Sequence, residues 1–309
     1  MSNVVALAGG VGGAKLAEGL ASVLGTSLTV IVNTGDDFEM HGLWISPDLD
    51  TVMYTLGGLA NPATGWGIAG DTFNNLEMMS RYSADDWFRL GDRDLATHIL
   101  RTRMLREGRT LTETTAALCE RLGIRARILP MCDERVSTLV ETDQGTLQFQ
   151  EYFVHRRWQP VVRSVRFEGI ERSRLTRQAS EALAGAQAII LCPSNPFVSI
   201  APVLAVPGVR GRIQDSKARR VAVSPIVGGE ALRGPAAKMF AEMGVPPTAL
   251  SVAERYRGLI DLFVLDRVDK EYCERIEMLG MQGMVTDTVM HGPEDRERLA
   301  AEILNRVKE

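Results

Sequence analysis

The sequence predicts an α/β protein, with a Rossmann-like, mostly parallel sheet, helices on both faces and a mainly helical insertion. The first observation is an apolar, β-branched run at residues 3–8, which is typical of a buried strand. A glycine-rich turn follows, and residues 14–24 then repeat leucine at every fourth position, as one face of a helix does. A second apolar run at residues 28–32 completes a strand–turn–helix–strand unit, which is how a parallel sheet begins.

The middle of the chain has a different pattern. Residues 95–122 are expected to be helical, and Thr110 with Glu113 three positions later is a capping-box signal for a helix start. Residues 136–142 and 147–154 are expected to pair as two strands of a hairpin.

The second half returns to alternating strand and helix patterns. Strands are expected at 188–191, 220–223 and 259–265, and helices at 174–183, 234–243 and 293–307. No linker rich in Pro, Gly or Ser divides the chain. We therefore expect a single domain over residues 1–309, with the helical insertion at about 60–125.

Composition and charge exclude several classes of protein. Lys and Arg total 35 and Asp and Glu total 39 in 309 residues, a formal net charge of −4, which argues against a dedicated nucleic-acid binder. No apolar run is long enough for a membrane span, and no basic segment precedes the apolar N-terminal run as in a signal peptide. The four cysteines lack a Cys-x-x-Cys spacing and are expected to be buried thiols of a cytoplasmic enzyme.

The glycine turn is the first candidate binding feature. Gly9, Gly10, Gly12 and Gly13 have no side chains, so backbone N–H groups there can approach the phosphates of a ligand. Lys15 either reaches a phosphate or is a solvated helix charge. The turn matches neither the Walker A loop nor the full dinucleotide fingerprint, and glycines that serve packing alone are the alternative. If a diphosphate binds here, Gly12→Ala should obstruct it while the strand–helix unit still forms, because alanine favours a helix.

Aspartates near the expected strand ends are the second feature. Asp36 and Asp37 follow the second strand directly, and Asp48 and Asp50 come shortly afterwards. Adjacent carboxylates repel each other unless a cation neutralises them, and oxygen ligands at this density suit Mg²⁺ or Mn²⁺. The alternative is local: Asp36 would serve a turn, and Asp48 or Asp50 would cap a helix starting at Thr51. An acid after the second strand could also hold an NAD ribose, which would make the protein an oxidoreductase.

Aromatic side chains crowd the segment that follows. Trp66 lies between Gly65 and Gly67, which is typical of a loop contact rather than of a core residue. Flat side chains close to acidic metal ligands favour a flat heteroaromatic substrate held by stacking, although packing in the core is the alternative for each of them. The aromatic residues of this segment are Phe38, Trp44, Tyr54, Trp66, Phe73, Tyr82, Trp87 and Phe88.

Two further loops carry polar side chains suited to a nucleotide. Residues 87–94 alternate in charge around a glycine, and Arg89 or Arg93 could bind a phosphoryl group bidentately. Ser194 and Asn195 follow a predicted strand and could hydrogen-bond a base, ribose or phosphate. A salt-bridged helix start and ordinary turn chemistry are the respective alternatives.

The motifs that carry a family resemblance are, in chain order, GGVGGAK, NTGDD, PDLDTVMYTLGG, WFRLGDRDLATH and PSNPFVSI. Together they resemble the 2-phospho-L-lactate transferase family of deazaflavin coenzyme F-420 biosynthesis, which includes phosphoenolpyruvate transferases. The resemblance implies a Rossmann-like, usually dimeric enzyme with Mg²⁺-dependent transfer. It also implies a guanosine diphosphate-linked phospholactate or phosphoenolpyruvyl donor, the ribityl hydroxyl of the deazaflavin Fo as acceptor, and release of GMP.

The same resemblance implies roles for individual residues. Asp50 and Arg89 fall where the family contacts Fo, and we add Trp66 to that set. Asp36 and Asp37 fall in the acidic motif near the metal, and Asp50 is expected to complete the ligand set. Asp50, Asp37 and Arg89 are the expected catalytic residues, with Asp50 orienting or deprotonating the acceptor hydroxyl.

The resemblance also places the donor and leaves alternatives open. The guanosine diphosphate is expected near Gly9, Gly10, Gly12, Gly13, Lys15, Ser194 and Asn195. The alternative function is a non-catalytic regulator that binds nucleotide sugars, as in a related family that shares the glycine-rich start. Whether lactate, enolpyruvate or glycerate is the transferred acid stays open.

Overall fold

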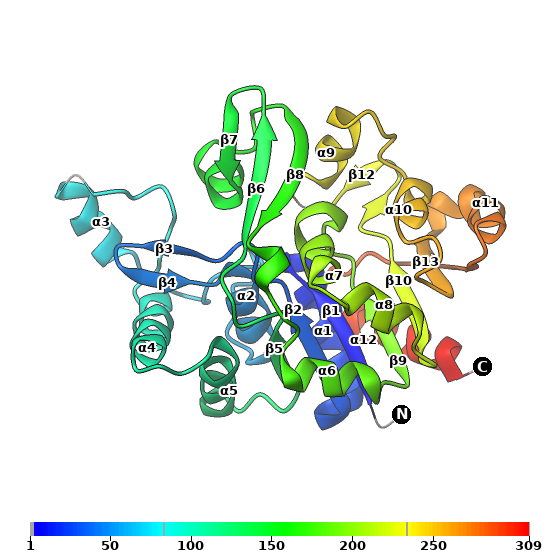
Figure 1. Cartoon of the computed structure of the whole chain (residues 1–309), viewed down its shortest axis with the longest axis horizontal. Coiled ribbons are helices and arrows are strands. Elements are labelled where there is room, and N and C mark those ends of the chain that lie inside the picture. The colour runs from blue at the N-terminus through cyan, green and yellow to red at the C-terminus, as the bar shows by residue number, and fades with distance from the viewer. Residues whose placement is uncertain (1–2, 83, 233, 309) are drawn as a thin grey trace.

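A seven-stranded parallel sheet forms the centre of the protein in the computed structural model, which describes residues 3–82, 84–232 and 234–308 (Figure 1). Its strand order is β14-β13-β10-β9-β1-β2-β5, and every neighbouring pair is parallel. The order reverses direction between β9 and β1, so ligands are expected outside the carboxyl ends of these two strands. The strands are β1 Val4–Ala8, β2 Leu28–Val32, β5 Arg127–Pro130, β9 Ala188–Leu191, β10 Arg219–Val223, β13 Leu262–Asp266 and β14 Gln282–Thr286.

Helices cover both faces of this sheet, as Figure 1 shows. Successive residues of β1 point to opposite faces: Val5 and Leu7 belong to one apolar core cluster, and Val4 and Ala6 belong to the other. The first cluster includes residues of α6 Arg177–Ala184, α7 Ala201–Ala205, α8 Val209–Gln214, α9 Ala236–Glu242, α10 Ala249–Arg255 and α11 Cys273–Met278. The second includes residues of α1 Gly10–Leu24, α2 Pro47–Leu56, α4 Asp94–Arg106, α5 Leu111–Arg121 and α12 Pro293–Lys308.

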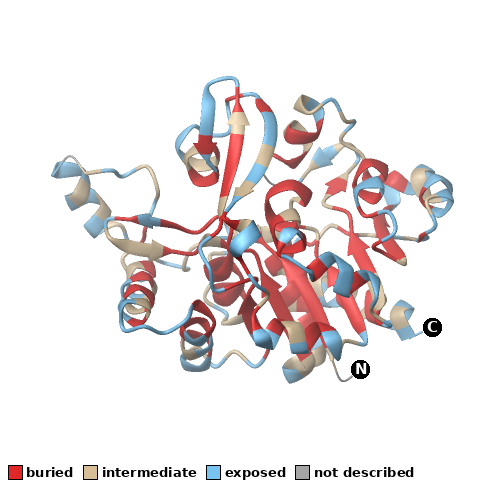
Figure 2. Cartoon of the chain, viewed as in Figure 1, coloured by how far each residue is buried: buried red, intermediate tan, exposed pale blue. Residues whose placement is uncertain are grey.

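Smaller elements project from the carboxyl side of the sheet. The antiparallel hairpin of β3 Phe38–Met40 and β4 Leu43–Ile45 extends toward α3 Asn74–Arg81, which has no buried residue (Figures 1 and 2). A second antiparallel sheet has the order β7-β6-β8. Its strands are β6 Ser137–Thr142, β7 Gly145–Gln148 and β8 Val162–Glu168, and a two-stranded ribbon joins β11 Ile226–Val227 to β12 Glu230–Ala231. Short 3₁₀ or π turns cover Gly25–Ser27, Glu151–His155, Ile170–Arg172, Pro196–Ile200 and Arg267–Tyr272.

The predicted fold class is confirmed, and several element boundaries are corrected. The capping box of Thr110 and Glu113 is present at the start of α5. The helical pattern over residues 95–122 is present as two helices, α4 and α5, with the second start at Thr110 as predicted. Helix α4 ends before Gly108, whose φ of 89° suits a helix end. The second strand of the predicted hairpin is only β7, since the chain turns into a π-helical segment at Glu151–His155. The strands β5, β8 and β14 were not predicted, and neither were the helices α7, α8, α10 and α11.

The glycine turn is itself helical, which corrects the predicted helix start at residue 14. Helix α1 begins at Gly10, and Gly9 is its N-cap. A Cβ at Gly12 would lie 2.3 Å from the backbone oxygen of Pro193. The alternative that these glycines serve packing therefore has support at Gly12, because α1 and the loop after β9 meet there without room for a methyl group. That the strand–helix unit still forms in Gly12→Ala stays a prediction.

None of the helices in the described ranges is long and apolar enough to cross a membrane. Within the same ranges the cysteines are unbridged: Cys119, Cys132 and Cys192 are buried, and Cys273 is half-buried. The prediction of buried thiols thus holds for three of the four.

We predict that Gly12→Ala lowers stability by about 1–3 kcal/mol, because the added methyl group overpacks the contact with Pro193. Urea unfolding followed by circular dichroism measures the change. Gly211→Ala in α8 is the matched control, since a Cβ there meets nothing within 4 Å. It should be neutral or gain about 0.5–1 kcal/mol. An equal response of the two variants would contradict this interpretation of Gly12.

Candidate active site

The loops after β1, β2 and β9 meet at the point where the strand order reverses. Ser194 ties the first loop to the third: its hydroxyl donates to the carbonyl of Gly9 at 2.8 Å and accepts from the Gly9 amide at 3.1 Å. The Asn33 amide donates to the carbonyl of Ala8 at 3.0 Å and connects the second loop to the first. The predicted nucleotide and metal residues therefore lie along one edge of the sheet.

Asp48 closes the N-terminus of α1. One of its oxygens accepts from the Gly10 amide at 2.8 Å, and the other accepts from the Asn33 side chain at 2.9 Å. A carboxylate beside a helix N-terminus is stabilised by the unpaired N–H groups and by the helix dipole. One alternative from the sequence was that Asp48 caps the helix that follows it. Asp48 does cap a helix, but that helix is α1 rather than α2. Its own helix, α2, starts at Pro47 and not at Thr51.

Most of the predicted diphosphate contacts already have partners within the protein. The Gly10 amide is bound to Asp48, and Ser194 is bound to Gly9. Asn195 accepts from the Phe197 amide at 2.9 Å, and the Lys15 ammonium donates to the Met290 carbonyl at 2.6 Å. A Cβ at Gly13 would lie 2.4 Å from the Ser194 hydroxyl, so this glycine also serves close packing.

Asp36 and Asp37 follow β2 and are both buried. The Oδ2 atom of Asp37 accepts from the Ser46 hydroxyl at 2.7 Å and from the Trp44 indole N–H at 3.1 Å. Within the described chain, the Oδ1 atoms of Asp36 and Asp37 are buried without a hydrogen-bonding partner. Each aspartate thus keeps one oxygen for a group that the protein itself does not supply.

Burial controls the ionisation of three of these carboxyl groups. Desolvation raises the pKa of Asp36 well above its ordinary value, and the nearby Asp48 carboxylate adds to the effect. Burial raises the pKa of Asp37 to about 8 despite the hydrogen bond from Ser46, and it raises the pKa of Asp48 to about 6. Such a cluster is stable at neutral pH when it holds protons or when a cation neutralises it.

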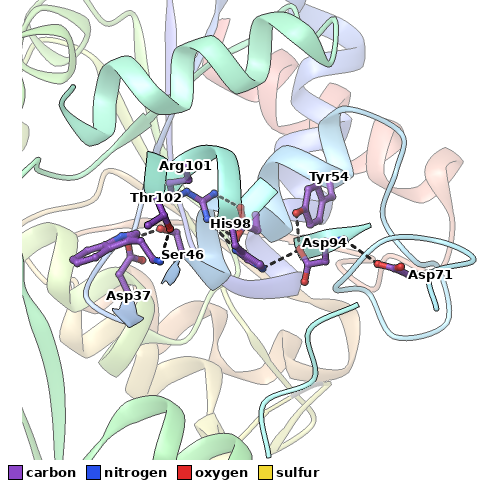
Figure 3. Close-up of polar contacts among 10 residues, drawn as sticks. Asp37, Ser46, Tyr54, Asp71, Asp94, His98, Arg101 and Thr102 are labelled. Atoms are coloured by element: carbon purple, nitrogen blue, oxygen red, sulfur yellow. Dashed lines mark hydrogen bonds and ion pairs between the residues drawn. The ribbon is translucent and has the colours of Figure 1, made fainter. Parts of the chain in front are cut away.

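Asp50 has a different environment, because Arg101 pairs with both of its oxygens. The Arg101 guanidinium is 1% exposed; Nη1 donates to Asp50 Oδ2 at 3.0 Å, and Nη2 makes a short contact with Oδ1 (Figure 3). Burial alone would lower the pKa of Arg101, but the Asp50 carboxylate outweighs it and raises the pKa. The bidentate pair leaves Asp50 neutralised by the protein itself.

The buried network continues from Asp50 through His98 to Asp94. His98 Nδ1 lies 3.7 Å from Asp50, and His98 Nε2 lies 3.2 Å from Asp94. The Tyr54 hydroxyl donates to Asp94 at 2.6 Å, and the Asp94 amide donates to Asp71 at 3.0 Å (Figure 3). The network therefore links the start of α2 to the start of α4, where the Asp71 carboxylate accepts from the amides of Arg93 and Asp94.

The residues present fit a divalent cation through two carboxylates rather than three. No group of three or more His, Cys, Asp or Glu side chains in the described ranges is arranged to hold a metal ion, and Asp50 is paired with Arg101. The predicted set of Asp36, Asp37 and Asp50 is therefore not gathered around one point. Mg²⁺ commonly takes one or two carboxylates and completes its shell with water and phosphate oxygens, which the free Oδ1 atoms of Asp36 and Asp37 suit.

A cavity of about 380 Å³ lies beside the β3–β4 hairpin. The Trp87 ring stacks on His155 with centroids 5.2 Å apart and planes 11° apart, and it also stacks on Phe38. A flat aromatic wall and several hydrogen-bonding side chains make the cavity suited to a planar, polar ligand. Its lining residues are Phe38, Glu39, Met40, His41, Asp85, Trp87, Gln148, Gln150, Glu151 and His155.

None of the three predicted acceptor residues is part of this lining. The Arg89 side chain is exposed and lies over the ring of Phe73, 4.4 Å from its centroid. Trp66 is 45% exposed in the loop before α3. Asp50 is also absent from the lining, so the structure leaves these three residues outside the aromatic cavity.

Other residues of the site escaped the sequence analysis. Arg101 and His98 lie on α4, whose charged residues resemble a solvated helix face until their burial is known. Gln148, Gln150 and His155 come from a segment more than 50 positions after the aromatic cluster. Trp44 was singled out as one of the crowded aromatic residues, and Ser46 had a usable signal in its position between the two acidic motifs.

Comparisons with known proteins agree on one family. The model described as 2-phospho-L-lactate transferase CofD matches residues 4–305. The chain is 39% identical over 298 residues to the 2-phospho-L-lactate transferase of Methanosarcina mazei, which covers 96% of this chain and 98% of that protein. It is 42% identical over 313 residues to the phosphoenolpyruvate transferase of Streptomyces coelicolor, with 99% and 98% covered.

Among solved structures, a UPF0052 family protein from Bacillus halodurans matches 98% of both chains with a TM-score of 0.64. Its sequence identity is 16%, so this likeness concerns the fold alone.

We predict that Arg101→Leu lowers stability by about 3–5 kcal/mol, because it leaves the Asp50 carboxylate buried without a counter-charge. The double variant with Asp50→Asn should recover most of this loss, since it removes the uncompensated charge as well. Urea unfolding of the two variants measures both effects.

Arg166→Leu is the control for this prediction, because Arg166 pairs with Glu141 at the surface. Loss of an exposed pair should cost less than about 1 kcal/mol. Equal losses of unfolding free energy for Arg101→Leu and Arg166→Leu would show that the buried pair contributes no more to stability than an exposed one.

Proposed function

This chain belongs to the 2-phospho-L-lactate transferase CofD family, and from that membership we propose that it makes the phosphodiester of coenzyme F-420. It would transfer 2-phospho-L-lactate or enolpyruvyl phosphate from a guanosine diphosphate-linked donor to the ribityl hydroxyl of Fo and release GMP. The relatives in Methanosarcina mazei and Streptomyces coelicolor are named for phospholactate and phosphoenolpyruvate transfer respectively, and both acids remain candidates.

The observation that carries the proposal is the pair of buried aspartates at the carboxyl edge of the sheet. Asp36 and Asp37 each have one buried oxygen without a partner in the described chain. Asp48, whose charge acts on Asp36, accepts from the Gly10 amide at the N-terminus of α1. Phosphoryl transfer needs a cation where negative charge gathers, and two carboxylates beside a helix N-terminus suit such an arrangement. The switch point of the sheet is also where open α/β folds bind nucleotides.

The reaction that we propose exchanges one phosphorus–oxygen bond for another. The acceptor hydroxyl oxygen bonds to the phosphorus that carries the organic acid, and the bond from that phosphorus to the bridging oxygen breaks. The bridging oxygen leaves with GMP, and the hydroxyl proton passes to solvent. When bound, Mg²⁺ neutralises charge on the non-bridging oxygens of the transferred group.

The remaining roles in the proposed reaction are assigned to residues of the protein itself. Asp36 and Asp37 would hold the cation through their free oxygens. Arg101 holds both oxygens of Asp50 in a bidentate pair, so we assign Asp50 to orienting the acceptor hydroxyl. Arg101 uses one acceptor site on each oxygen of Asp50, and a carboxylate retains others for a hydroxyl donor.

We place the deazaflavin ring in the cavity of about 380 Å³ whose lining includes the stacked pair of Trp87 and His155. The cavity begins at Phe38, one residue after Asp37, so an acceptor bound there reaches toward the acidic pair. This placement replaces Trp66 as the stacking residue, and Arg89 is kept as a contact for the part of Fo outside the cavity.

We predict that transfer from the guanosine diphosphate-linked donor to Fo requires Mg²⁺ and stops in excess chelator. Asp37→Asn should fold normally and lose on the order of a hundredfold or more in rate, since it removes one ligand of the cation. Asp215→Asn, at the end of α8, is the control and should keep the wild-type rate. Mass spectrometry of the product identifies the acid, and full activity in chelator would refute the proposed metal.

We predict that Trp87→Ala weakens Fo binding roughly tenfold, about 1.4 kcal/mol, because it removes one stacking surface of the cavity. Titration of Fo fluorescence measures this affinity, and calorimetry with guanosine diphosphate should show no change. Tyr82→Ala is the control, since Tyr82 is 74% exposed and does not line the cavity. Unchanged Fo affinity in the Trp87 variant would place the acceptor elsewhere.

A further inference from the structure

The side chain of Asp37 is held by two donors that both bind the same oxygen. Ser46 Oγ donates to Oδ2 at 2.7 Å, and Trp44 Nε1 donates to Oδ2 at 3.1 Å. The other oxygen, Oδ1, is buried without a hydrogen-bonding partner in the described chain. Two donors that arrive from different residues restrict the rotation of the carboxylate and leave Oδ1 as its free end.

The hydrogen bond from Ser46 comes at a cost to helix α2. Ser46 is the N-cap of α2, a position where a serine hydroxyl normally accepts from a backbone amide of the first turn. Here the side chain makes no such cap and donates to Asp37 instead. An N-cap hydrogen bond normally stabilises a helix, and local rules are broken in this way mainly at functional or strained sites.

The position of Trp44 is fixed independently of Asp37. Its backbone amide donates to the Thr102 hydroxyl of α4 at 2.7 Å, and it pairs with Glu39 across the β3–β4 hairpin. The Arg135 guanidinium lies over its ring, 5.6 Å from the centroid. Trp44 lies in β4 and Ser46 follows β4 directly, so the hairpin brings both donors back onto the aspartate that precedes it.

We propose that Trp44 and Ser46 are positioning residues that hold Oδ2 of Asp37 so that Oδ1 is presented to the divalent cation. The inference rests on the proposed function, because it takes Asp37 as a ligand of that cation. Donors that orient a liganding carboxylate typically contribute 10–100-fold to metal affinity or activity.

The test measures binding of Mn²⁺ alone to the full-length protein, from the loss of its free electron paramagnetic resonance signal. Trp44→Phe keeps the ring and removes the N–H, and Ser46→Ala removes the hydroxyl without removing a helix cap. We expect each variant to bind Mn²⁺ about tenfold more weakly than the wild type. Ser46→Thr keeps a hydroxyl donor and should restore most of the affinity.

A second background separates positioning from a general structural effect. In Asp37→Asn protein, Trp44→Phe should cause no further loss of Mn²⁺ affinity, because the oxygen that it orients is no longer a carboxylate oxygen. Trp158→Phe and Ser173→Ala are matched controls: Trp158 is 39% exposed on another loop, and Ser173 is a buried serine whose hydroxyl donates to Ile170. Both should bind Mn²⁺ as the wild type does.

The outcomes distinguish this inference from the proposed function. If Asp37→Asn weakens Mn²⁺ binding and Trp44→Phe and Ser46→Ala do not, the positioning role is overturned and the proposed metal site stands. If Asp37→Asn has no effect, or the wild type binds no Mn²⁺, the metal site and the positioning role both fail. Equal losses from Trp44→Phe in the wild-type and Asp37→Asn backgrounds also overturn the inference.

Discussion

The site depends on how four buried aspartates, Asp36, Asp37, Asp48 and Asp50, are compensated. The Arg101 guanidinium forms an ion pair with one of them, Asp50. Arg101 satisfies Asp50 with a bidentate pair, and the amides of Gly10 and Asn33 satisfy Asp48. Asp50 therefore has a counter-charge and Asp48 has two hydrogen-bond donors, but burial still raises the pKa of Asp48 as it raises those of Asp36 and Asp37. Asp36 and Asp37 differ from Asp48 in that each also has a buried oxygen without a hydrogen-bonding partner in the described chain. A buried carboxylate without a compensating partner lowers the stability of the folded protein. The same carboxylate would favour binding of a cation together with phosphate, which is the function proposed for this site.

The sheet explains why this imbalance lies where it does. Parallel strands end at a common edge, and the reversal of strand order between β9 and β1 opens that edge to a ligand. The approach of α1 to this edge depends on Gly12 and Gly13, where a Cβ would collide with Pro193 and Ser194. These glycines therefore bring a helix N-terminus to the acidic loops by allowing close packing. That role differs from a direct contact with a diphosphate, although both use the same absence of a side chain.

The sequence was informative where chemistry and chain position coincide. Apolar runs next to glycine and helical periodicity predicted five of the seven strands of the central sheet and several of its helices, while β5, β14, α7, α8, α10 and α11 were missed. Tandem aspartates after a strand singled out Asp36 and Asp37, whose role in metal binding stays a prediction. It was uninformative where the partner is distant: Arg101 is 51 positions from Asp50, and a charged helix residue looks solvated until its burial is known. Local spacing also could not tell Asp48, which caps α1, from Asp50, which pairs with α4. The wall of the cavity at Gln148 to His155 depends on the second antiparallel sheet folding toward the first hairpin, which no local pattern predicts.

The β3–β4 hairpin joins the two halves of the proposed reaction. Its first residue, Phe38, lines the aromatic cavity, and the residue before it is Asp37. The same hairpin carries Trp44, which donates to Asp37 and is tied to α4 through Thr102. A ligand that packs against Phe38 and Trp87 therefore acts on the element that holds the carboxylate. Binding of the acceptor and binding of the cation would therefore be coupled through this hairpin. Such coupling requires contacts that differ between two states of the hairpin, and it needs no long-range pathway.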